Sequence, residues 1–116
     1  MKILILFTLI LIAFQGYSQQ VFNTSNDTTI TPQIIFLEVS DSTLSDILVY
    51  RVDSINKIYK DGLWFELSSH EDSYFNYKIT SDTSNYDMKI YFVNMPKNAA
   101  WINRDKRLVY INAKDN

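Results

Sequence analysis

The chain has 116 residues, of which 47% are hydrophobic, 15% aromatic and 21% charged, with a net charge of −2 and no cysteine. This length allows one domain, and the composition is too apolar and aromatic for a disordered chain. The absence of cysteine excludes disulfide scaffolds, thiol catalysis and cysteine-ligated zinc. One histidine excludes a multi-histidine metal site within one chain.

The glycine count and the charge exclude two further classes. Two glycines, Gly16 and Gly62, cannot form a P-loop or a dinucleotide fingerprint, which need several. An excess of acidic residues argues against a general nucleic-acid binder, because phosphate neutralisation needs surplus Lys and Arg. We therefore expect no cofactor, no metal and no nucleic-acid partner.

Residues 1–18 have the pattern of a signal peptide. Lys2 precedes an apolar run from Ile3 to Phe14 that is shorter than the ~20 residues of a membrane span. Gly16 and Ser18 supply small side chains at −3 and −1 of a cleavage site after Ser18. We expect residues 1–18 to be removed, leaving a mature chain without a transmembrane segment. The protein is then periplasmic or secreted, and the lack of cysteine favours a bacterial envelope.

Residues 19–32 read as a flexible polar tether, because Asn23 to Thr29 are all polar and Pro32 closes the stretch. A single domain then covers residues 33–116. It begins with a strand at 34–39, whose nearly continuous apolar character indicates partial cover on both faces. Apolar residues at three- and four-residue steps from Leu44 to Tyr59 predict a helix, which Gly62 ends in a left-handed conformation.

Residues of alternating character predict strands at 63–68, 75–80 and 88–93. A last pair at 101–102 and 108–111 flanks a polar loop at 103–107, as in a hairpin. The order β-α-β-β-β-β predicts an α+β two-layer domain, with one helix packed on an antiparallel sheet of about four to five strands. The order resembles the strand–helix–four-strand plan of cystatin-like folds in topology alone, since no cystatin motif occurs.

Such a sheet has an open face, and that face is the first candidate for interaction. It would carry Trp64, Tyr74, Lys78 and Tyr91, opposite the helix-facing Leu63 and Phe65. Tyr and Trp combine large contact area with a hydrogen-bonding tip and are enriched at binding surfaces. The alternative is that these side chains form cross-strand pairs protecting an exposed sheet.

The second candidate is the loop that contains Arg104 and Arg107. Three cations between 104 and 107 can contact an anionic surface or plug the active site of an enzyme. The loop at 94–100 is another candidate plug. The alternative is a solvated hairpin tip.

The sequence offers weak candidates for catalysis. Glu38 and Glu66 lie within strands and would form a hydrolase pair only if held in one cleft. His70 beside Glu71 and Asp72 is more typical of a turn than of a general base or metal site, and no nucleophile elbow surrounds it. We expect no catalytic residues.

These observations favour a small exported binding module without a catalytic site, with an envelope protein or a glycan as partner. The first alternative is an inhibitor of a secreted or envelope enzyme that acts through a loop. The second is a small carboxylate-dependent hydrolase. The sequence does not determine the oligomeric state.

Overall fold

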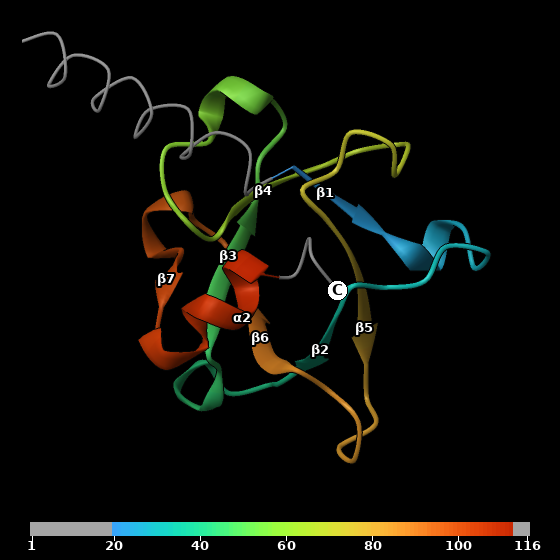
Figure 1. Cartoon of the computed structure of the whole chain (residues 1–116). Coiled ribbons are helices and arrows are strands. Elements are labelled where there is room, and N and C mark those ends of the chain that lie inside the picture. The colour runs from blue at the N-terminus through green and yellow to red at the C-terminus, as the bar shows by residue number, and fades with distance from the viewer. Residues whose placement is uncertain (1–19, 113–116) are drawn as a thin grey trace, which may run out of the picture.

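Six short segments rich in β-branched and aromatic residues form strands in the computed structural model, which describes residues 20–112 (Figure 1). The strands are β1 (Gln20–Asn23), β2 (Ile34–Glu38), β3 (Ile47–Arg51), β4 (Leu63–Glu66), β5 (Phe75–Thr80) and β6 (Met88–Phe92). They lie in the order β4-β1-β5-β2-β6-β3, and β3 also pairs with β4, which closes the ring. Every pairing within the ring is parallel.

The predicted fold class is therefore wrong. The chain forms a closed parallel barrel rather than an α+β domain in which a helix packs on an antiparallel sheet, and the cystatin-like plan does not apply. The expected two-layer arrangement, with one sheet face under a helix and the other open, is absent: one side of each strand points into the barrel, and the other is partly covered by the connections.

The strands are interleaved around the ring. β5 separates β1 from β2, β6 separates β2 from β3, and β1 separates β4 from β5. Among strands of the ring that follow each other in the chain, only β3 and β4 are neighbours. The chain therefore travels round the barrel more than once while it keeps every strand pointing the same way.

Each connection must return from the carboxyl end of one strand to the amino end of the next. All of these connections are short, from the shortest at 81–87 to the longest at 52–62. A parallel crossover usually needs a dozen residues or more and a helix. Here the strands are short enough for an extended chain to run back along them, since each residue spans up to about 3.3 Å. Three of the five connections contain a one-turn 3₁₀ helix: η1 (Thr24–Asn26), η2 (Ser42–Leu44) and η3 (Ile55–Lys57).

Side-chain oxygens extend three of the parallel pairings by one residue. Asp46, just before β3, donates its N–H to Lys89 O at 2.8 Å, and its carboxylate accepts the Lys89 N–H at 2.7 Å. Asp87 before β6 makes the same two bonds with Ile35, and Gln33 before β2 makes them with Asn76. In a parallel ladder, the backbone N–H and C=O of one residue do not bond to both the C=O and the N–H of a single partner residue. These side chains supply the missing acceptor, and we call the three pairs the entry clamps.

Inward residues alternate along the strands and fill the barrel. Phe36, Trp64 and Tyr77 are fully buried, with ring centroids 4.9 to 6.0 Å apart in tilted or edge-on arrangements. The buried cluster contains Val21, Ile34, Phe36, Ile47, Val49, Trp64, Phe75, Tyr77, Met88, Ile90 and Tyr110. The outward side of the strands is partly covered as well, which accounts for their continuous apolar runs.

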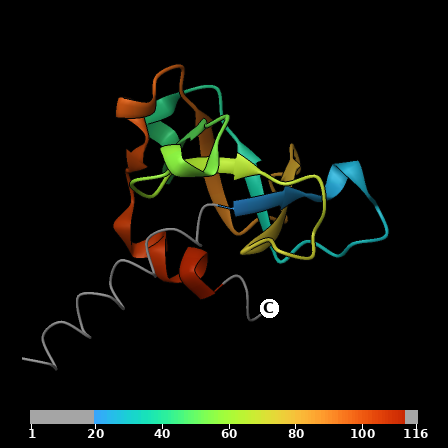
Figure 2. The ribbon, with the colours of Figure 1, turned by 90° about the horizontal axis from the view of Figure 1, so that it is seen from above.

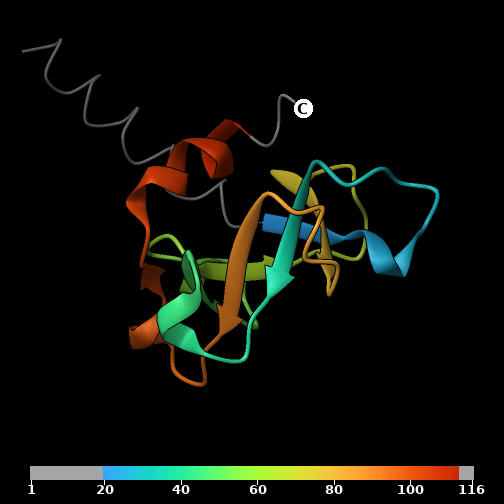
Figure 3. The same ribbon diagram turned by 90° about the horizontal axis from the view of Figure 1, so that it is seen from below.

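The last part of the described chain closes the amino end of the barrel. β7 (Ala100–Trp101) pairs antiparallel with the first half of β3, after η4 (Pro96–Asn98). η5 (Arg104–Lys106) and α2 (Arg107–Ile111) follow, and α2 lies beyond the ends at which β2 and β6 begin (Figures 2 and 3). Tyr110 is buried there and accepts a hydrogen bond of 2.8 Å from the Trp64 indole.

Two local predictions were wrong for identifiable reasons. The segment predicted as a helix carries η2, β3 and η3, and Leu44, Ile55 and Tyr59, which completed its apolar stripe, are exposed. Residues 108–111 are helical rather than the second strand of a hairpin.

The stretch expected as a tether also carries structure, because it contains β1 and η1, and Val21 is fully buried. The predicted signal peptide lies outside the described residues. None of the helices that the structure describes is long and apolar enough to cross a membrane.

Aspartates cap several of the tight turns. The Asp41 carboxylate accepts hydrogen bonds from the backbone N–H and the hydroxyl of Thr43, and Asp27 and Asp82 do the same for the residue two positions later. In all three, these hydrogen bonds lower the pKa of the carboxyl below its usual value of 3.8. The bond from the hydroxyl has the larger effect, and the bond from the backbone N–H has the next largest. These turns are therefore held by ionised carboxylates.

This capping predicts acid lability. A lowered pKa in the folded state means that each carboxylate stabilises the fold fully above pH 3.8 and loses that effect as the pH falls through the folded value. Replacing Asp27, Asp41 and Asp82 by Asn keeps the acceptor oxygen but removes the titration. Urea unfolding should show wild type more stable than the triple variant at pH 6, with the difference vanishing near pH 2. A pH-independent difference would contradict the assignment.

The entry clamps predict a graded response at Asp46. Asp46→Ala leaves the half-buried Lys89 N–H without its acceptor and should lower the free energy of unfolding by about 1–3 kcal/mol. Asp46→Asn retains an oxygen and should cost less, as measured by urea denaturation. Asp53→Ala, which removes only an exposed ion pair with Lys57, is the control and should barely move the midpoint. Equal losses for Ala and Asn at position 46 would contradict the clamp.

Candidate functional site

The expected interaction face does not form. Trp64 is fully buried in the barrel, whereas Lys78 and Tyr91 lie on the outward side of β5 and β6. Tyr74 is half-buried and donates its hydroxyl proton to Ile111 O at 2.6 Å. The face assignment was reversed at β4, where Leu63 and Phe65 point outward under the connections and Trp64 points inward.

Arg104 and Arg107, the other predicted pair, do line one depression. Both are exposed and both border a pocket of about 550 Å³. We call it the cationic pocket; its lining residues are Tyr59, Lys60, Asp61, Ala99, Ala100, Trp101, Arg104 and Arg107. They come from the connection before β4 and from residues 99–107, two segments that lie far apart in the sequence.

Asp61 organises this pocket. Its Oδ2 accepts the Trp101 indole N–H at 2.9 Å and the Arg107 Nε–H at 3.2 Å. Its side chain is 26% exposed, so the two bonds are partly shielded from water. One carboxylate thereby sets the orientation of an aromatic ring and of a guanidinium on the pocket wall.

Gly62 allows the segment that lines the cationic pocket at 59–61 to lie close to the barrel. Its φ is +92°, a conformation that costs other residues about 1–3 kcal/mol. A Cβ at this position would lie 2.6 Å from Leu48 O and 3.2 Å from the Ala99 Cβ. The sequence predicted the left-handed conformation of Gly62, but as the end of a helix that does not form. In the structure, Gly62 places residues 59–61 beside β3, where β4 and β7 both pair with that strand.

The charges of the pocket favour an anionic ligand. Three cations, Lys60, Arg104 and Arg107, face one carboxylate, Asp61. Lys60 is positioned by donating to the backbone oxygen of Lys97 at 3.1 Å. Trp101 contributes a half-buried ring beside these charges. Cations next to an aromatic ring can hold a charged group together with an adjoining ring or chain.

A second polar cluster lies at the carboxyl ends of the strands. Glu66 accepts a hydrogen bond from the hydroxyl of Tyr77 and pairs with Arg51 at 3.4 Å. The Arg51 guanidinium lies 3.8 Å from the centroid of the Phe92 ring. Both Glu66 oxygens are thus engaged, and Glu38 is exposed at the end of β2. This cluster closes the barrel mouth rather than presenting a free carboxylate pair.

The other residues that the sequence analysis considered for a site are His70 and the loop at 94–100. His70 is exposed and packs edge-on against the Phe22 ring, with centroids 6.1 Å apart. Within residues 20–112, no three His, Asp or Glu side chains are grouped closely enough to hold a metal ion. The loop at 94–100 contributes Ala99 and Ala100 to the cationic pocket.

Sequence reasoning missed Lys60 and Trp101. Lys60 lies between the predicted helix and Gly62, and Trp101 lies in a predicted hairpin strand. Two signals pointed to them: Gly62 marks a sharp change of direction shortly after Lys60, and Trp101 is a large aromatic residue in a short apolar stretch beside a basic loop.

A family model described as the 7(1) septoil knot domain matches residues 18–102. The description names a knot, which accords with the interleaved strand order. No curated protein and no solved structure matches the chain. Arg104 and Arg107 lie beyond the matched residues, whereas Lys60, Asp61 and Trp101 lie within them.

A substitution at Trp64 tests directly whether this side chain points into the barrel or onto an open face. Trp64→Ala removes the largest core side chain and the donor to Tyr110, and should lower the free energy of unfolding by about 3–5 kcal/mol. Lys78→Ala, an exposed change on β5, should leave the urea midpoint in place. A folded Trp64→Ala variant with wild-type stability would restore the open-face interpretation.

Proposed function

The chain belongs to the 7(1) septoil knot domain family, and from this premise we propose that it is a small exported binding module of the bacterial envelope, without catalytic activity. Its partner is a glycan or an envelope protein that places an anionic group in the cationic pocket. The observation that carries the proposal is the convergence of Lys60, Arg104 and Arg107 around Trp101.

The overall charge makes this convergence informative. A chain with a net charge of −2 repels polyanions in general, so it binds one only where cations are concentrated. Hydrogen bonds to charged groups contribute about 1.5–3 kcal/mol each, more than neutral ones. Two such bonds to one anion are enough for a specific, salt-sensitive interaction.

The shape of the site favours a binding module over the two alternatives. An inhibitor that plugs an active site presents a convex loop, whereas Arg104 and Arg107 border a depression. A carboxylate-dependent hydrolase needs an acid and a base that face one substrate. Glu66, the better placed candidate, is already paired with Arg51 and Tyr77.

The proposal predicts that an acidic polysaccharide binds through the pocket. Purified protein should be retarded in affinity electrophoresis by polygalacturonate but not by neutral dextran, and less so as salt is raised. The double variant Lys60→Ala, Arg104→Ala should weaken binding by about 100-fold or more, because two charged contacts are lost.

A matched control removes the same charge elsewhere. Lys78 and Lys89 lie on β5 and β6, outside the pocket, and replacing both by Ala should leave the retardation unchanged. Equal weakening by the two double variants would mean that net charge, and not the pocket, governs binding. Retardation by neither polymer would refute the proposed function.

A further inference from the structure

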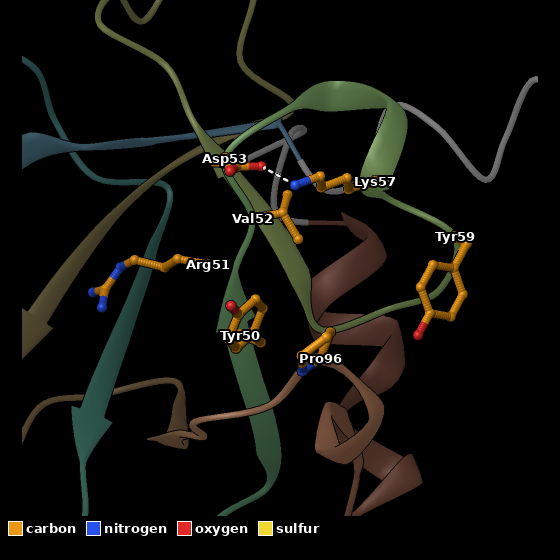
Figure 4. A pocket seen from close by; sticks show the side chains of 7 residues that line it. All are labelled: Tyr50, Arg51, Val52, Asp53, Lys57, Tyr59 and Pro96. Carbon is orange, nitrogen blue, oxygen red and sulfur yellow. Dashed lines mark ion pairs between the residues drawn. The ribbon is translucent and has the colours of Figure 1, made fainter.

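A second depression adjoins the cationic pocket. It has a volume of about 430 Å³ and is lined by Tyr50, Arg51, Val52, Asp53, Lys57, Tyr59 and Pro96. We call it the tyrosine pocket. Figure 4 shows Tyr50 and Tyr59 on opposite sides, with Val52 and Pro96 between them, while the Arg51 side chain points away.

Tyr59 belongs to both depressions and therefore joins them into one surface. Tyr59 is 63% exposed, and the next residue, Lys60, is one of the cations of the cationic pocket. A ligand that continues past Tyr59 from the cationic pocket enters the tyrosine pocket. The proposed anionic ligand thus has a second place to bind if it is a chain.

The lining of the tyrosine pocket suits a sugar ring. Two tyrosines and a proline offer flat apolar faces, and the Asp53–Lys57 ion pair of 2.7 Å lies at the rim. The Lys57 hydrogen bond lowers the pKa of Asp53, so this carboxylate is ionised at neutral pH and can accept hydrogen bonds from hydroxyl groups. An acyl chain has no polar group with which to bond to this exposed ion pair. Sugar hydroxyls can bond to both partners.

We propose that the ligand is an acidic oligosaccharide of at least two sugar units, with a carboxylated unit in the cationic pocket and a neighbouring unit against Tyr50 and Tyr59 in the tyrosine pocket. This inference rests on the proposed function, since it extends the ligand of the same site. Lys60 and Arg104 supply the charge contacts at every ligand length, and Tyr50 contributes only when the ligand has a second unit.

The test compares ligand lengths by calorimetric titration with galacturonate and with its dimer and trimer. Wild type should bind the dimer and trimer about tenfold more tightly than the monomer, the effect of one added ring contact. Tyr50→Leu keeps apolar bulk beside Val52 and removes the ring face. It should lose this gain and bind the monomer as wild type does. Tyr91→Leu, a half-buried tyrosine on β6 outside both pockets, should retain the gain.

The outcomes separate the two proposals. If wild type binds the monomer but gains nothing with length, or if Tyr50→Leu keeps the gain, the oligosaccharide inference is wrong and the cationic pocket stands. If no ligand length binds, both fail. Tighter binding of dodecanoate than of the galacturonate trimer, retained in Tyr50→Leu, would overturn the sugar in favour of an acyl chain. Urea midpoints of all variants establish that they are folded.

Discussion

The fold depends on one constraint: six strands must all point the same way in a closed ring, although no connection between them is longer than the one at 52–62. Connections this short cannot hold a packed crossover helix, so they run over the outside of the barrel as extended chain, with a single 3₁₀ turn in three of the five. Short strands keep the return path short. Asp46, Asp87 and Gln33 then fix the register at the strand starts with side-chain oxygens.

The same constraint decides where a ligand can bind. The barrel interior is filled by aromatic side chains, and its two ends are closed by Tyr110 and by the Arg51–Glu66–Tyr77 cluster. Binding surfaces are therefore built from the connections. The two pockets described lie beside β3, where β4 and β7 pair with the same edge of that strand. Gly62 allows the chain before β4 to lie close to Leu48 and Ala99 there.

The sequence was informative about strands and misleading about their arrangement. Alternation located β4, β5 and β6, and the apolar run at 34–39 located β2, because these signals are local. The helix prediction failed because it counted the exposed Leu44 and Ile55 as part of one apolar stripe. The fully buried residues of this segment, Ile47 and Val49, are instead two positions apart, as in a strand. Continuous apolar runs in several strands were the available signal for a parallel barrel. Of the site, Arg104 and Arg107 were found from charge alone. Lys60 and Trp101 depend on chain folding that local patterns do not report.

The interleaved order also bears on how the chain reaches its native state. β1 is the first described strand and ends at Asn23, yet its partners β4 and β5 begin only at Leu63 and Phe75. Its pairing must wait until most of the barrel sequence has been synthesised, and nearly every ladder joins distant segments. Such a high contact order is associated with folding in milliseconds to seconds rather than microseconds. A chain that folds this slowly stays unfolded for longer after synthesis, and its apolar strand segments are exposed to other chains during that time.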